Sequence, residues 1–128
     1  MQLTITLTIA AAAALLNIWL MLRVGKVRIA DNVLVGDGGN ENVIRRMRAH
    51  SNFIESAPLV LILIAAIELS IGTNIALWIV SSLYILGRIG HGFGMDGGSL
   101  EKGRLIGTII TLLTLLGLAG WAIYISYT

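Results

Sequence analysis

Residues 48–72 read RAHSNFIESAPLVLILIAAIELSIG, a polar stretch that runs directly into a long apolar one. From Phe53 onward the segment is suited to a membrane-buried helix, because crossing a hydrocarbon core of ~30 Å takes about 20 helical residues. Arg48, Asn52 and Glu55 lie at its entrance, where polar side chains are costly. Each of them therefore needs a partner or a function.

The composition extends this interpretation to the whole chain. Of the 128 residues, 56% are hydrophobic and only 12% are charged, whereas about a quarter of a soluble domain is charged. Four apolar runs alternate with polar, Gly-rich stretches, and the third is short unless Asn74 and Gly90 lie in the membrane interfaces. We therefore predict an all-α, four-helix membrane bundle that forms a single integral membrane domain over residues 1–128. The predicted spans are residues 3–22, 53–71, 74–90 and 105–127.

The basic residues predict the orientation in the membrane. Eight of the nine Lys and Arg residues lie between the first and second predicted spans or between the third and fourth, and Arg88 lies near the end of the third. Positive residues collect on the cytoplasmic side, so both termini are expected outside. The positive charges mark membrane boundaries and form no continuous stripe, which argues against nucleic-acid binding.

Residue types missing from the chain exclude several kinds of chemistry. The chain has no cysteine, so it forms no disulfide and any reactive thiol must come from a ligand. His50 and His91 lack the neighbours of a metal centre, and no metal site is expected. GDGGN, residues 36–40, lacks the Gly-Lys-Ser/Thr of a nucleotide-binding loop.

Several smaller patterns predict helix ends and helix packing. Asn40 and Ser99 each precede a predicted helix start and are suitable N-cap residues. Exposed helix N-termini at these places could also help to bind an anion. Gly103 and Gly107 have the GxxxG spacing of closely packed membrane helices, within a tight bundle or an oligomer.

Polar residues gather on two predicted helix faces. Positions 45, 48, 52 and 55 fall within roughly an 80° arc at ~100° per residue, whereas Arg46 and His50 point elsewhere. Tyr84, Arg88 and His91 share a second face. Arg104 stands at the entrance of the fourth span, on the same side of the membrane.

Two interpretations of these faces are possible. Arginines near helix ends can extend to the lipid headgroups, and Arg48 with Glu55 could form a plain ion pair. Headgroup contact does not explain Glu55 or Asn52, however. Cations, an amide and a carboxylate together suit a zwitterionic ligand, because Arg binds carboxylates and Glu accepts hydrogen bonds from an ammonium.

Arg45-x-x-Arg48-Ala49-x-x-Asn52-x-x-Glu55 resembles the second-helix signature of the MAPEG family, the membrane-associated proteins in eicosanoid and glutathione metabolism. GDGG, RAHSNFIESAPL and GRxxH (residues 87–91) are most similar to its small bacterial members. The resemblance covers the whole chain and implies a homotrimer, placed in the bacterial inner membrane, that binds glutathione between subunits near the cytoplasmic surface.

The resemblance also implies roles for individual residues. The ligand contacts implied by position are Arg48, Asn52, Glu55, Arg45, Arg28, His50, Arg88 and His91, with His50 reaching the ligand from an adjacent subunit. Arg104 matches the arginine that stabilises the glutathione thiolate, although Lys102 could take its place. Ser56 stands where relatives often carry Tyr.

The implied function is that of a detoxifying membrane transferase or peroxidase with glutathione as co-substrate. The thiolate would attack a lipophilic electrophile that arrives from the bilayer, or reduce a lipid hydroperoxide. One alternative is a glutathione-binding protein without turnover. Another is a small proton-coupled transporter that uses Glu55 or Glu68, the latter expected in the membrane interface.

Overall fold

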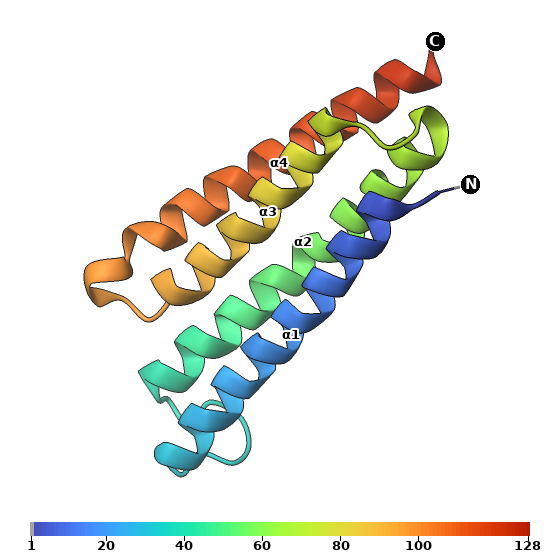
Figure 1. Cartoon of the computed structure of the whole chain (residues 1–128). Coiled ribbons are helices and arrows are strands. Elements are labelled where there is room, and N and C mark those ends of the chain that lie inside the picture. Colours follow the sequence, from blue (N-terminus) through green and yellow to red (C-terminus); the bar gives the residue numbers. More distant parts are fainter. Residues whose placement is uncertain (1) are drawn as a thin grey trace.

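The structure, a computed structural model, describes residues 2–128 and is a bundle of four antiparallel helices (Figure 1). Both termini and the α2–α3 turn lie at one end of the bundle. The α1–α2 and α3–α4 connections lie at the other, called here the basic end because it carries all nine Lys and Arg residues. The elements are α1 (Thr4–Ala30), α2 (Glu41–Ile71), α3 (Ile75–Gly94), a short 3-10 helix η1 (Gly98–Leu100) and α4 (Lys102–Ser126).

All four long helices have the length and hydropathy needed to cross a membrane, and no strand occurs among residues 2–128. The predicted all-α, four-span architecture is therefore confirmed. The helices extend beyond the predicted spans at the basic end. α2 has 31 residues and is about 46 Å long, so its first turns project beyond a hydrocarbon core of ~30 Å.

The two predicted N-caps have different outcomes. The side chain of Asn40 accepts a hydrogen bond from the backbone N–H of Val43 at 3.1 Å, as expected at the start of α2. The prediction for Ser99 is wrong, because Ser99 lies within η1. The backbone turns there in a 3-10 conformation, and α4 begins at Lys102 without a side-chain cap.

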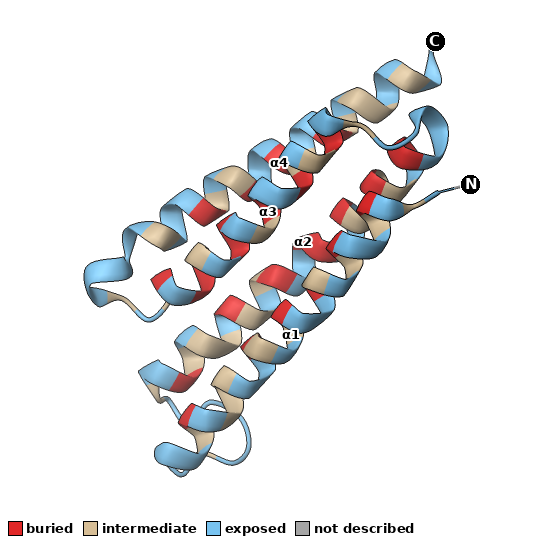
Figure 2. Ribbon diagram, in the orientation of Figure 1, coloured by how far each residue is buried: buried red, intermediate tan, exposed pale blue. Residues whose placement is uncertain are grey.

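The buried residues lie between the helices, and the outer faces are largely exposed (Figure 2). Many large apolar side chains are among the exposed residues. On α1 the buried residues recur every three to four positions, at Ile5, Ile9, Ala13, Leu16 and Leu20. This spacing places one stripe of the helix against its neighbours. Large apolar side chains outside this stripe remain exposed, which suits helices surrounded by lipid.

α3 and α4 approach each other closely at the predicted GxxxG pair. A Cβ atom at Gly107 would lie 2.5 Å from the carbonyl oxygen of Gly87, and one at Gly103 would collide with the carbonyl oxygen of Gly90. Only glycine permits backbone contacts this short. The pair therefore packs two helices of the same chain together and fixes where α4 lies relative to α3.

Glu68 joins the beginning of α1 to the end of α2. Its buried carboxylate accepts hydrogen bonds from the backbone N–H groups of Ile5 and Thr6 and from the hydroxyls of Thr6 and Thr73. Leu3, the N-cap residue of α1, makes no side-chain cap. Glu68 is thus 1% exposed and caps a neighbouring helix near the end of α2, and its position in the membrane interface remains a prediction.

Candidate functional site

A cavity of about 580 Å³, called here the main cavity, opens between α2, α3 and α4 toward the basic end. Its volume lies within the range of about 300–1,000 Å³ that is typical of small-molecule sites. Its lining combines cations, a carboxylate, an amide, an imidazole and hydroxyls. The lining residues are Arg48, Ser51, Asn52, Glu55, His91, Met95, Arg104, Leu105 and Thr108.

α2 supplies one wall of the main cavity. Arg48, Asn52 and Glu55 lie on the same face of this regular helix and all line the cavity, as their spacing predicts. Among residues 2–128, neither Arg48 nor Glu55 takes part in an ion pair. Their charges are therefore available to a ligand, and the alternative of an ion pair between them is not observed.

α3 and α4 supply the opposite wall. His91 and Met95 enter from the end of α3, and Arg104 and Thr108 from the first turns of α4. Arg104 has one ion pair, a 3.7 Å contact with Glu101 in which both side chains are more than half exposed. Its guanidinium can reorient toward a ligand at little cost, because exposed ion pairs contribute only about 0–1 kcal/mol.

A second cavity of about 440 Å³ adjoins the first, since Arg48, Met95 and Arg104 border both. Arg45 lines this adjoining cavity and not the main one. Arg45 is also bound to Glu41 at 3.6 Å. The four-residue polar strip predicted on α2 thus lines two neighbouring cavities: Asn52 and Glu55 line the main cavity, Arg45 lines the adjoining one, and Arg48 lines both.

Arg88 lies behind the wall of the main cavity. It is 1% exposed, donates a hydrogen bond to the Thr111 hydroxyl at 3.1 Å and contacts His91 Nδ1 at 3.4 Å. Its guanidinium carbon is 6.0 Å from the centre of the Phe53 ring. Arg88 lines neither cavity, so within this single chain its contact with a ligand would be indirect, through His91 or through its charge.

His50 and Arg28 lie away from both cavities. The imidazole of His50 is hydrogen-bonded to Asn17 of α1 at 2.7 Å. Arg28 donates to the carbonyl oxygens of Val33 and Gly36 in the α1–α2 connection. Within one chain, both residues hold local structure at the basic end.

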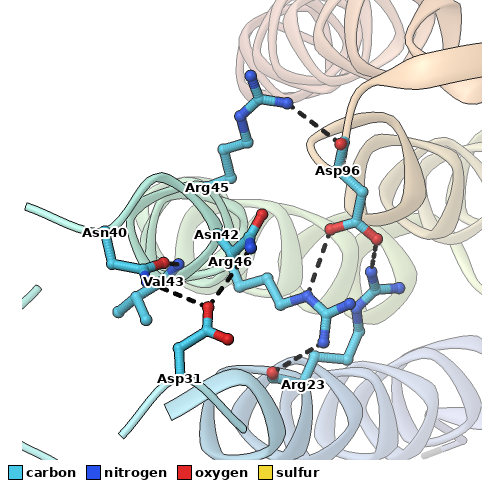
Figure 3. A network of polar contacts seen from close by, with 8 residues as sticks. All are labelled: Arg23, Asp31, Asn40, Asn42, Val43, Arg45, Arg46 and Asp96. Carbon is cyan, nitrogen blue, oxygen red and sulfur yellow. Dashed lines mark hydrogen bonds and ion pairs between the residues drawn. The ribbon is translucent and has the colours of Figure 1, made fainter. Parts of the chain in front are cut away.

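Asp96 joins the α3–α4 connection to two helices at the basic end (Figure 3). Its carboxylate accepts from Arg23 of α1 and from Arg46 of α2, and its carbonyl oxygen accepts from Arg45 at 3.1 Å. A second carboxylate, Asp31, accepts from the side-chain amides that open α2. The α3–α4 connection, which follows the cavity residue Met95, is thereby fixed to the first two helices.

The sequence pattern did not identify every residue of the site. Ser51, Leu105 and Thr108 line the main cavity, but small and apolar residues of this kind are common in any membrane helix. Thr108 follows Arg104 by one helical turn, which is the one signal in the sequence that could have pointed to it. Ser56 hydrogen-bonds the Tyr84 hydroxyl at 2.8 Å inside the core, so it does not face the cavity.

No group of three or more His, Asp or Glu side chains with metal-binding geometry occurs in residues 2–128.

A comparison with known proteins supports the family resemblance of the polar motif on α2. The family model described as "MAPEG family" matches residues 6–124, which include every residue that lines the two cavities. A search of curated proteins found no match.

Proposed function

Because the chain belongs to the MAPEG family, we propose that this integral membrane protein binds glutathione in the main cavity and transfers its thiolate to a lipophilic acceptor. One observation supports the proposal above all others. The cavity presents two guanidiniums and a carboxylate, and two of these three charges have no ion-pair partner within residues 2–128.

Glutathione matches this arrangement of charges. The tripeptide carries two carboxylates, an ammonium and a thiol. Arg48 and Arg104 suit carboxylate or thiolate groups, Glu55 suits the ammonium, and Asn52 can pair with a peptide group. The adjoining cavity, lined by Arg45, gives room for the rest of an extended ligand.

Arg104 is the residue proposed to activate the thiol. A nearby guanidinium stabilises a thiolate and raises its fraction at neutral pH. Arg104 lines both cavities, whereas Lys102 lines neither, which favours Arg104 over Lys102. The lipophilic co-substrate would arrive from the bilayer along the exposed apolar side chains near Leu105. An electrophile would take up the glutathione sulfur in a new C–S bond, whereas a lipid hydroperoxide would be reduced to the alcohol and water as two glutathiones form a disulfide.

Isothermal titration calorimetry on the detergent-purified protein tests glutathione binding. Arg48→Ala and Glu55→Gln are each expected to weaken binding by about 10- to 100-fold, the range for one charge-assisted hydrogen bond. Lys26→Ala is the control, because this residue lines none of the described cavities. Absence of heat at millimolar glutathione would refute the proposal.

The ultraviolet absorbance of the bound thiolate tests the assignment of Arg104. The thiolate signal is expected with the wild-type protein and with Lys102→Ala, and is expected to disappear in Arg104→Ala. The opposite result would assign activation to Lys102. Binding without any thiolate signal, and without turnover of a lipophilic electrophile, would instead identify a glutathione-binding protein without catalysis.

The transporter alternative receives less support. Glu68 accepts four hydrogen bonds from residues of α1 and from Thr73, so its carboxylate caps a helix. Glu55 lies at the wall of a cavity near the basic end. A coupling carboxylate is expected near the middle of the bilayer, between helices that rearrange.

A further inference from the structure

Arg88 is a buried cation whose role the proposed function does not explain. Among residues 2–128 it has no carboxylate partner within ion-pair distance, and its Nε has no hydrogen-bond partner. A buried charge without a counter-ion is costly, in proteins and in membranes. Packing alone would be served better by an apolar side chain of similar size.

The contact between Arg88 and His91 determines where the imidazole carries its proton. A guanidinium has five N–H donors and no acceptor. The 3.4 Å contact from Arg88 Nη2 therefore requires an unprotonated Nδ1 on His91 as the acceptor. The proton of a neutral imidazole is then on Nε2.

His91 Nε2 is in a position to meet a ligand. His91 lines the main cavity, and no described residue forms a hydrogen bond with its Nε2. The enclosed side-chain atoms without a partner are Ser81 Oγ and Arg88 Nε. Since His91 Nε2 is not one of them, it is accessible from the cavity.

We propose that Arg88 is a positioning residue that holds His91 as a neutral hydrogen-bond donor, with its Nε2–H directed at an anionic group of the ligand in the main cavity. The proposal rests on the proposed function for the identity of that ligand, a thiol with anionic groups. A neutral ring adds a donor beside Arg88 and Arg104 without adding a third positive charge. The positive charge of Arg88 further favours an anion in the cavity.

Nitrogen NMR of the ligand-free wild-type protein tests the tautomer directly. The chain has two histidines, so labelling histidine with ¹⁵N gives two rings, and His50→Gln identifies the signals of His91. We expect an unprotonated Nδ1 and a protonated Nε2 on His91. A proton on Nδ1, or on both nitrogens, would overturn the proposal.

Two substitutions of His91 test the donor role. The side-chain amide of glutamine reaches approximately the position of Nε2, whereas that of asparagine reaches the position of Nδ1. His91→Gln is therefore expected to retain most of the glutathione affinity, and His91→Asn to lose about 10- to 100-fold. Equal losses in both variants would show that no donor at the Nε2 position is needed.

Variants of Arg88 test whether it acts through His91. Arg88→Lys keeps a charged donor and is expected to keep the Nε2–H tautomer, and Arg88→Met is expected to give a mixture of tautomers. Tyr84→Phe is the control, because it removes another buried polar group of the same α3 face. An unchanged tautomer in a folded Arg88→Met variant would overturn the positioning role.

The outcomes for the two proposals can be separated. If Arg88→Met does not fold, the wild-type spectrum still decides the tautomer. If glutathione does not bind at all, the proposed function is refuted, while the ligand-free spectrum still decides the arrangement of Arg88 and His91. Binding of glutathione that leaves the Nε2 signal unchanged would overturn the donor role alone.

Discussion

At Glu68 a single carboxylate replaces the local cap that α1 lacks. The first amides of a helix have no partner within the helix, and a negative charge beside them is favourable because the helix dipole is positive at this end. Both carboxylate oxygens are engaged, each within 2.9 Å of its donors. Glu68 therefore holds the first turn of α1 against the last turns of α2.

Glu68→Gln is expected to destabilise the protein by about 1.5–3 kcal/mol, the range for a hydrogen bond to a charged group. The substitution removes the charge and replaces one acceptor oxygen by an N–H donor group that faces the amides of α1. Thermal unfolding in detergent measures the change. Glu101→Gln, at a side chain that is 64% exposed, should leave the unfolding temperature nearly unchanged, and equal shifts in both variants would contradict this account.

The residues of the site could be predicted from the sequence where they all lie on the same helix. Arg48, Asn52 and Glu55 share a face of α2, so helical spacing alone brought them together. The partners of Glu68 and Arg88 could not be predicted in this way. Their contacts to Ile5, Thr6 and Thr111 cross between helices and depend on how the helices are placed beside each other.

Among the elements, the α3–α4 pair positions one wall of the main cavity. Gly103 and Gly107 allow α4 to lie directly against the backbone of α3. Arg104 and Thr108 each lie one position beyond these glycines, so the same close contact places them at the main cavity. Helix packing and cavity lining are thus determined within the same helical turn.

Gly107→Ala is expected to destabilise the bundle by about 1–3 kcal/mol, because the added methyl group would overpack the interface. It should also weaken glutathione binding by shifting Arg104. Gly117→Ala is the matched control, since a Cβ atom there meets no other atom within 4 Å. Unfolding and titration of both variants measure the effects, and a neutral Gly107→Ala would show that α3 and α4 can separate freely.

Asp96→Asn is expected to loosen the α3–α4 connection. The substitution weakens the contacts to Arg23 and Arg46, and the partial exposure of these groups limits the loss of stability to about 1 kcal/mol. Hydrogen exchange should therefore rise in residues 95–101 more than the global stability falls. Asp37→Asn, in the exposed α1–α2 connection, is the control, and an equal rise there would contradict a specific role of Asp96.

The helices themselves were predictable from hydropathy, but hydropathy alone does not give their ends at the basic end. Hydropathy detects where lipid contact stops, and the polar first turns of α2 from Glu41 onward carry no such signal. The start of α2 was found from its cap, Asn40. The same reasoning failed at Ser99, because this residue lies in the middle of a 3-10 helix and caps no α-helix.

For the whole molecule, the distribution of positive charge predicts a cytoplasmic basic end. The chain lacks cysteine, so single-cysteine variants report this directly. An impermeant maleimide on intact cells should label Thr128→Cys at once and Val35→Cys only after permeabilisation. Both positions are exposed, so the reverse pattern would show that the orientation is inverted.

The assembly of the whole molecule as a homotrimer remains a prediction. Native mass spectrometry from detergent is expected to show a complex of three chains, since the family resemblance implies sites between subunits. A monomer that still binds glutathione would contradict this. The four helices could be predicted because each is visible in the hydropathy of the chain. Contacts between subunits could not, because a helix face that contacts another subunit has the same apolar composition as one that contacts lipid.

The unequal lengths of α2 and α3 have a consequence for the surrounding bilayer. The apolar part of α3, residues 75–89, is about 22 Å long, which is shorter than a hydrocarbon core of ~30 Å. Such hydrophobic mismatch is relieved by local thinning of the membrane, at a cost of fractions of a kcal/mol per Å. The bilayer beside α3 is therefore expected to be thinner, and membranes with short acyl chains should favour this protein over thick ones.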